Sequence, residues 1–168
     1  REKDGKHLIT SRIEHPAVLG AMQYLEKRGW TVTYLPVDKA GLVPPETLDK
    51  AMRPDTVLVS VMYANNEIGT VQPIAELAKI AHRHKAVFHT DAVQALGKLN
   101  CNIDKLNADL VSVSAHKVYG PKGVGALYIR KGTKLRSQLH GGHHEFNRRA
   151  GTENVAGIAG FGAAVTRI

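Results

Sequence analysis

The sequence predicts an α/β fold built on a mainly parallel sheet. Short runs of β-branched and other apolar residues alternate along the chain with segments in which apolar residues recur at helical spacing, and this alternation is typical of successive βαβ units. One run, TVLVSVMY at 56–63, is almost continuously apolar, as expected of a strand that is covered on both faces. No repeat, low-complexity tract or linker interrupts the pattern, so the 168 residues read as one domain, or most of one.

The first elements follow one another closely. HLIT at 7–10 is the first predicted strand. The helix after it spans 16–29, with Pro16 suited to its first turn and Gly29 to its C-terminal cap. WTVTYLPV at 30–37 is the second strand.

The middle of the chain continues the alternation. A helix at 45–52 follows the turn DKAG and leads into the apolar strand at 56–63. Pro73 opens a helix that runs to residue 85, and its apolar residues fall on one face at helical spacing. The run at 86–90 is the next buried strand, and it ends at Asp91.

Two further strands complete the predicted sheet. DLVSVS at 109–114 ends just before Lys117, and GALYIR at 125–130 follows so closely that a hairpin-like return is expected. The last residues, GFGAAVTRI, read as part of a helix.

Charge and cysteine content narrow the class of protein. The chain has 23 Lys and Arg against 15 Asp and Glu, a formal net charge of +8, but the basic residues are scattered and few aromatic residues stand among them. We therefore interpret the charge as solvated surface and expect no nucleic-acid partner. The single cysteine, Cys101, excludes an internal disulfide framework and fits a reducing compartment. No apolar run is long enough for a membrane span, so we expect no membrane partner and a cytoplasmic location, an organelle being the alternative.

Polar residues follow four of the predicted strands at the point where each strand ends. Parallel strands open their carboxyl ends on one edge of a sheet, where ligands bind. Residues separated by about a hundred positions are therefore expected to share one pocket. These residues are His15 after the first strand, Asn65 and Asn66 after the third, Asp91 and Gln94 after the fourth, and Ser114, His116 and Lys117 after the fifth.

The residue types in this set suggest a carbonyl cofactor. A lysine amine is an unusual choice at a partly desolvated strand end unless it is paired or covalently engaged, and a Schiff base with a carbonyl cofactor removes most of the cost. A carboxylate such as Asp91 would keep a pyridinium nitrogen protonated. Gln94 would donate to the phenolic oxygen of such a cofactor, and His15 would stack on its ring or move a proton.

Several separate motifs in the same order and spacing closely resemble the cysteine desulfurases of the NifS/IscS type, within the class-V aminotransferase family. The motifs are EHPAVL, NNEIGTVQPI, HTDAVQALGK and SAHKVYGPKGVGALY, and the match runs over essentially the whole chain. The resemblance implies the three-layer αβα large domain of the aspartate-aminotransferase-like (fold type I) enzymes. It also implies pyridoxal 5'-phosphate as cofactor, and residues 1–168 as the cofactor-binding domain, incomplete at both ends.

The resemblance assigns roles around the cofactor ring. It makes Lys117 the Schiff-base lysine, which with His15 would be catalytic. Asp91 becomes the partner of the pyridine nitrogen, Gln94 the donor to the phenolic oxygen, and His15 the residue that stacks on the ring.

The resemblance also assigns roles at the cofactor phosphate and the substrate. Asn66 would contact cofactor or substrate, and Ser114 with His116 would bind the phosphate. Thr152, in RRAGTEN, matches a threonine that reaches the phosphate of the neighbouring subunit in a homodimer.

The activity that the resemblance implies converts L-cysteine to alanine and passes the sulfur, as an enzyme persulfide, to an acceptor or iron–sulfur scaffold protein. Residues 1–168 contain neither the family's upstream phosphate loop nor the substrate-binding arginine and persulfide cysteine of its downstream domain. Cys101 aligns with none of these, so we expect the isolated chain to be inactive. A non-catalytic fragment or interaction module, or a related enzyme such as a selenocysteine lyase or aminotransferase, remains the alternative.

Simpler interpretations stand beside these assignments. GPKGVG is by itself only a tight glycine turn, and Lys117 alone would be a surface lysine. HGGHHE at 140–145 offers three histidines and a glutamate, but a glycine-rich loop supplies no defined tetrahedral arrangement, so no metal is expected. Arg148 and Arg149 would serve phosphate, partner or solvent.

Overall fold

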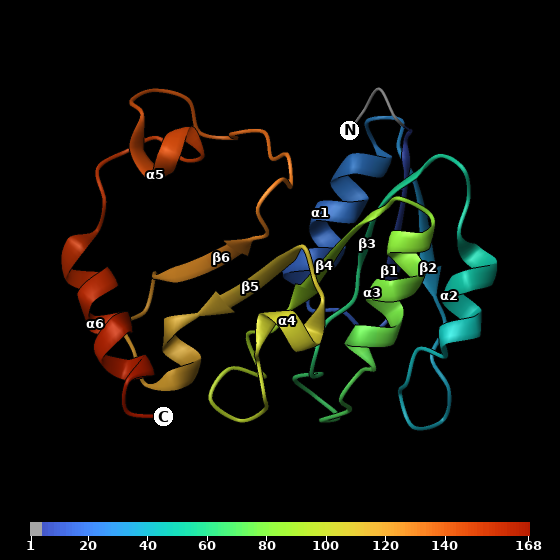
Figure 1. The fold of residues 1–168 in the computed structure, drawn as a ribbon, viewed down its shortest axis with the longest axis horizontal. Helices are drawn as coiled ribbons and strands as arrows, with labels where there is room; N and C mark the ends of the chain where they lie inside the picture. The colour runs from blue at the N-terminus through green and yellow to red at the C-terminus, as the bar shows by residue number, and fades with distance from the viewer. Residues whose placement is uncertain (1–4) are drawn as a thin grey trace.

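Six strands form one sheet in the computed structural model, which describes residues 5–168 (Figure 1). Their order across the sheet is β2-β1-β3-β4-β5-β6. The bounds are β1 His7–Ser11, β2 Thr31–Leu35, β3 Thr56–Ser60, β4 Val87–Asp91, β5 Leu110–Ser114 and β6 Gly125–Ile129. Residues 1–4 of the expected 1–168 domain lie outside the described residues.

The first five strands are parallel to their neighbours, and β6 is antiparallel to β5. The pairing of β5 with β6 runs from Leu110 opposite Ile129 to Ser114 opposite Gly125, which confirms the expected hairpin-like return. β3 is shorter than the predicted strand at 56–63. Its hydrogen bonding to β4 nevertheless continues, because Tyr63 N donates to Asp91 O at 2.8 Å.

The helices alternate with the strands in the predicted order. Those expected from the sequence are α1 Pro16–Glu26, α2 Pro45–Ala51, α3 Ile74–Arg83 and α6 Val155–Val165. α1 begins at Pro16 as predicted, and Gly29 follows its end with φ 82°, a left-handed conformation that glycine adopts at little cost. The short elements that the sequence did not indicate are α4 Ile103–Leu106, the 3-10 turn η1 Ala115–Val118 and α5 His144–Asn147.

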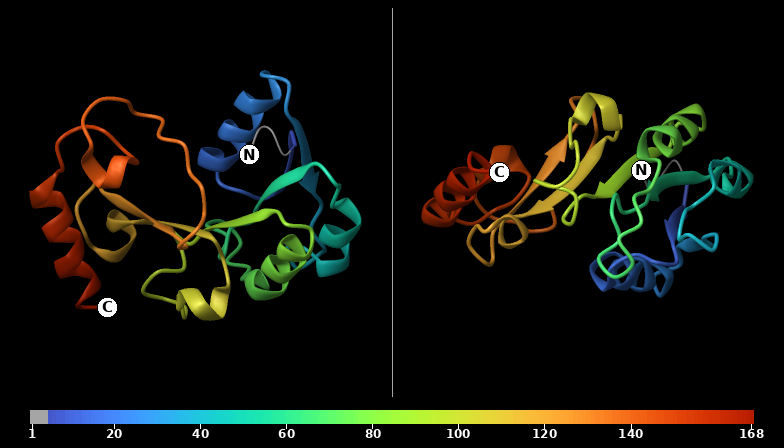
Figure 2. Two further views of the ribbon diagram at one scale, coloured as in Figure 1. Left: turned by 45° about the horizontal axis from the view of Figure 1, so that its top comes forward. Right: turned by 90° about the horizontal axis from the view of Figure 1, so that it is seen from below.

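Helices cover both faces of the sheet (Figure 2). On one face, Leu48 of α2, Leu77 of α3 and Leu106 of α4 pack with sheet residues in the larger core. On the other face, Met22 of α1 packs against Leu8 and Val57. The three layers confirm the predicted fold class. Among the described residues, no helix has the length and apolar character needed to cross a membrane.

A partly buried histidine joins three strands near the carboxyl end of β4. His89 Nδ1 lies 2.8 Å from Ser60 Oγ on β3, and its Nε2 lies 2.8 Å from Ser112 Oγ on β5. Burial lowers the pKa of His89 to about 4, although the charge of Asp91 acts to raise it. The ring is therefore neutral near pH 7 and exchanges hydrogen bonds with both hydroxyls.

The low pKa of His89 predicts a loss of stability in acid. The unfolded chain binds a proton at His89 near pH 6.5 and the folded chain only near pH 4, so the free energy of unfolding falls as the pH drops between these values. We expect a loss of up to about 3 kcal/mol relative to His89→Gln, measured by urea unfolding at a series of pH values. His140→Gln, in an exposed loop, is the control and should follow the unsubstituted protein. Parallel profiles for the protein and His89→Gln would contradict the assignment.

Candidate active site

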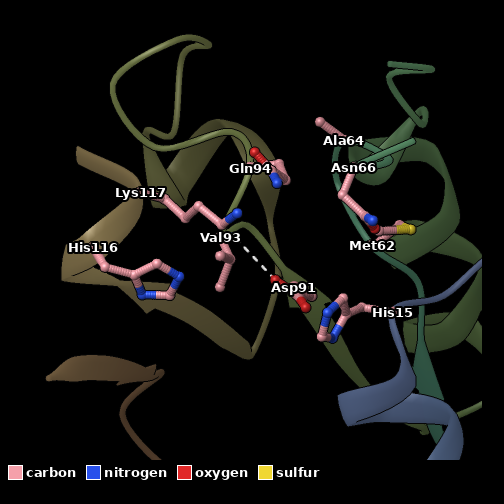
Figure 3. Close-up of a pocket in the computed structure, with 9 residues that line it drawn as sticks. All are labelled: His15, Met62, Ala64, Asn66, Asp91, Val93, Gln94, His116 and Lys117. Atoms are coloured by element: carbon pink, nitrogen blue, oxygen red, sulfur yellow. Dashed lines mark hydrogen bonds between the residues drawn. The ribbon is translucent and has the colours of Figure 1, made fainter. Parts of the chain in front are cut away.

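One pocket opens at the carboxyl ends of the central strands (Figure 3). Its volume is about 270 Å³, near the lower end of the range of about 300–1,000 Å³ that is common for ligand sites. The residues that line it are His15, Met62, Ala64, Asn66, Asp91, Val93, Gln94, His116 and Lys117.

The strand order brings these residues together. β1, β3, β4 and β5 are adjacent and parallel, so the segments that leave their carboxyl ends meet at one edge. His15 follows β1, Asn66 follows β3, Asp91 ends β4, and Lys117 lies on η1 after β5. Residues 102 positions apart in the sequence, His15 and Lys117, thus line one pocket.

Six of the predicted site residues line the pocket: His15, Asn66, Asp91, Gln94, His116 and Lys117. Ser114 does not line it, but its Oγ lies 2.7 Å from His116 Nδ1, and the binding of phosphate by these two residues stays a prediction. Thr152 is exposed and lies outside the pocket lining. Its role at a neighbouring subunit stays a prediction.

Asp91 is held by the turn that follows β4. Its Oδ1 accepts a hydrogen bond from Val93 N at 2.9 Å, the dashed line in Figure 3. The turn then carries Gln94 to the pocket wall. Both side chains are partly buried, and the bond from Val93 N orients the carboxylate.

His15 both caps α1 and lines the pocket. It is the N-cap of α1, and its Nδ1 accepts a hydrogen bond from Ala17 N at 3.1 Å. A ring nitrogen that accepts carries no proton, so in this arrangement the ring proton is on Nε2. The ring thus caps the helix with one nitrogen and can donate with the other.

Lys117 differs from expectation in its surroundings. It lies on η1, beyond the end of β5, and its side chain is exposed. The partial desolvation expected for an amine at the strand end is therefore wrong for this chain. Figure 3 shows the amine extending into the pocket between His116 and Asp91. Gly120 closes the turn, where an added Cβ would lie 2.9 Å from Ala115 O, so this position requires glycine.

Some residues of the site were not predicted. Met62, Ala64 and Val93 line the pocket, and their place beside Asn66 and Asp91 was the only sequence signal for them. Asn65, named with Asn66 in the sequence, is buried, and its Nδ2 donates to Ile13 O at 2.7 Å. It therefore has a structural role.

The histidine-rich segment lies away from this pocket. His143, His144 and Glu145 border a separate, open depression with Phe146 and Asn147. Within residues 5–168, no group of three or more His, Cys, Asp or Glu side chains is placed to hold a metal ion.

The chain resembles known proteins over nearly its whole length. It is 62% identical over 161 residues to cysteine desulfurase IscS of Dictyoglomus turgidum, covering 96% of the chain and 41% of that protein. It is 59% identical over 160 residues to cysteine desulfurase IscS of Methanosarcina thermophila, covering 95% of the chain and 40% of that protein. The chain thus spans about 40% of the length of these curated relatives.

Solved structures share the fold. One described as SspA in complex with cysteine superposes with a TM-score of 0.94 at 44% identity, over 98% of this chain and 48% of that one. A NifS-like protein superposes with a TM-score of 0.94 at 48% identity, over 98% of this chain and 46% of that one. The model of the class-V aminotransferases matches residues 2–168, and the chain therefore belongs to the class-V aminotransferase family.

Proposed function

We propose that this chain is the cofactor-binding core of a pyridoxal-phosphate-dependent cysteine desulfurase. The observation that carries the proposal is the convergence of a lysine amine, a carboxylate, two amides and two imidazoles on one pocket at the carboxyl edge of the sheet. Class-V aminotransferases and cysteine desulfurases are pyridoxal-phosphate enzymes, and the polar groups of that cofactor can be matched to these side chains.

The residues present fit the cofactor. Lys117 offers an amine for the aldehyde, Asp91 a carboxylate for the pyridine nitrogen, and Gln94 an amide for the phenolic oxygen. His116, paired with Ser114, offers a donor for the phosphate. These groups come from different elements but face one cavity (Figure 3), so each can act without displacing another.

When bound, pyridoxal phosphate acts as an electron sink for the negative charge that develops at the substrate Cα. The carboxylate of Asp91 would keep a proton on the ring nitrogen and so sustain that sink. The Lys117 amine would take the proton from Cα as a general base. His15 would donate a proton from Nε2, because its Nδ1 accepts the hydrogen bond from Ala17 N.

Cysteine is the substrate that the relatives favour. Two curated relatives are named cysteine desulfurases, and one neighbouring structure is described as a complex with cysteine. Cys101 is a poor acceptor for the sulfur, because it packs against the core, lies outside the pocket lining, and burial raises the pKa of its thiol. We therefore propose that the sulfur passes to a cysteine elsewhere in the protein and then to an acceptor or iron–sulfur scaffold protein.

We also propose that the protein acts as a homodimer. Thr152 is exposed, on the segment that precedes α6 and outside this chain's own pocket. That position suits a residue whose role lies in the pocket of a second copy.

The assignment of Lys117 predicts a specific covalent adduct. Added pyridoxal phosphate should give an absorbance band at the edge of the visible range, and after reduction with borohydride peptide mass mapping should place the adduct on Lys117. Lys117→Ala should lose both the band before reduction and the adduct after it. In an active protein, Lys117→Ala should lower alanine release from L-cysteine by at least about 10²–10⁴-fold.

The matched control is Lys122→Ala, which removes an exposed lysine from the following turn and should keep the adduct. Adducts spread over surface lysines, or an adduct retained by Lys117→Ala, would overturn the cofactor assignment. Release of alanine from selenocysteine but not from cysteine would retain the cofactor site and replace the proposed substrate.

The two roles of His15 can be separated by two substitutions. His15→Asn keeps an N-cap acceptor for Ala17 N and should change stability little, whereas His15→Ala should lower the free energy of unfolding by about 0.5–2 kcal/mol. Both variants remove the imidazole from the pocket, so both should weaken cofactor binding or proton transfer. Thermal unfolding measured beside cofactor titration distinguishes the effects. Equal stability of the two variants would show that the cap contributes nothing.

A further inference from the structure

A buried carboxyl group lies directly behind the pocket. Glu14 is 4% exposed. Its Oε1 accepts two hydrogen bonds, from Ser11 Oγ at 2.6 Å and from Met62 N at 2.8 Å. Its Oε2 is buried and has no hydrogen-bond partner within the described part of the chain. A carboxyl in this position is costly and calls for an explanation.

Glu14 joins two neighbouring segments that form one side of the site, opposite His116 and Lys117 (Figure 3). The next residue in the chain is His15, on the β1–α1 segment, and the residue that Glu14 binds is Met62, which begins the pocket wall after β3. A second bond ties the same segments, because Asn65 Nδ2 donates to Ile13 O at 2.7 Å. Residues that immediately precede His15 and Asn66 thus hold these two pocket residues at a fixed separation.

The charge of Glu14 depends on pH near neutrality. The pKa of Glu14 is raised to about 7, chiefly by burial and also by the negative charge of Asp91, while the bonds from Ser11 and Met62 act in the opposite direction. The contacts from β1 and from the segment after β3 are uncharged. Asp91, at the end of β4, is the neighbouring ionisable group that acts on Glu14, and His15 is the next titratable residue along its own segment.

We propose that Glu14 is a positioning residue, which ties the β1–α1 segment to the segment after β3 and thereby sets His15 and Asn66 relative to one another on the side of the pocket that faces Lys117. Protonated Glu14 carries no charge and therefore does not repel the carboxylate of Asp91. Ionisation of Glu14 places a second buried negative charge near Asp91 and weakens the junction. This inference deepens the proposed function, on which it rests for the identity of the bound cofactor.

Three readouts test the proposal, using Glu14→Gln and Glu14→Ala in the protein. Glu14→Gln keeps an oxygen acceptor for Met62 N and cannot ionise, whereas Glu14→Ala removes the tie. Amide hydrogen exchange at Met62 should accelerate in Glu14→Ala and stay slow in Glu14→Gln. The affinity for pyridoxal phosphate should fall by about tenfold in Glu14→Ala, the size expected from the loss of a buried hydrogen bond, and the glutamine should restore it.

The pH profile gives the third readout. Since the pKa of Glu14 is about 7 when folded and about 4.5 otherwise, the unfolding temperature of the unsubstituted protein relative to that of Glu14→Gln should fall as the pH rises from 4.5 through 7 and then level off. The opposite effect of His89 is present in both proteins and cancels in this difference. Glu14→Gln is close in shape and should fold even if Glu14→Ala does not.

The outcomes separate this inference from the proposed function. Unchanged exchange at Met62 in Glu14→Ala, or a pH profile of Glu14→Gln that follows the unsubstituted protein, overturns the role of Glu14. Failure of the unsubstituted protein to form an adduct on Lys117 overturns the cofactor, while the exchange and pH readouts still report on the tie.

Discussion

The parallel pairing of β1, β3, β4 and β5 is the constraint on which the site depends. The segments that follow these four strands therefore all leave from one edge of the sheet. The helices pack on the two faces of the sheet and do not cover that edge. No single segment contains the pocket. The catalytic chemistry that we propose is therefore a property of the sheet order, and a change in strand pairing would separate the lysine from the carboxylate even if every side chain were kept.

The electrostatics of the site follow from differences in burial. Asp91 is partly buried at the end of β4 and holds a backbone amide, whereas Glu14 lies deeper, with one oxygen unpartnered. The two carboxyls thus have unlike environments, which is a common way to give two acids different charges at one pH. Lys117 and His116, both exposed, stand across the cavity from Asp91. The pocket thus combines a carboxylate with amine, imidazole and amide groups.

Much of this arrangement could be predicted from the sequence. Apolar runs indicated the strands. The polar residues that follow these runs, such as Asp91 and Lys117, indicated the edge of the sheet at which the strand ends meet. Glu14 was missed because a carboxylate in a polar tract reads as surface, and only the contacts of Ser11 and Met62 show that it is buried. Short elements such as α4 were missed because a few residues do not form a stable helix alone. α4 is held by its cap, where Asn102 accepts from Asp104 N and Lys105 N.

The spread of the pocket along the sequence also concerns how the chain folds. The segment after β1 and the turn after β5 are about a hundred residues apart in the sequence and line one pocket only when β5 has paired with β4, and pairing of non-local segments is slower than the formation of local structure. A chain that has paired only β1 to β4 presents His15, Asn66 and Asp91 but not the amine. Ligand that needs both sides of the pocket can bind only the completed fold, so binding stabilises the native state over every partly folded one. Cofactor binding would then depend on β5 having joined the sheet.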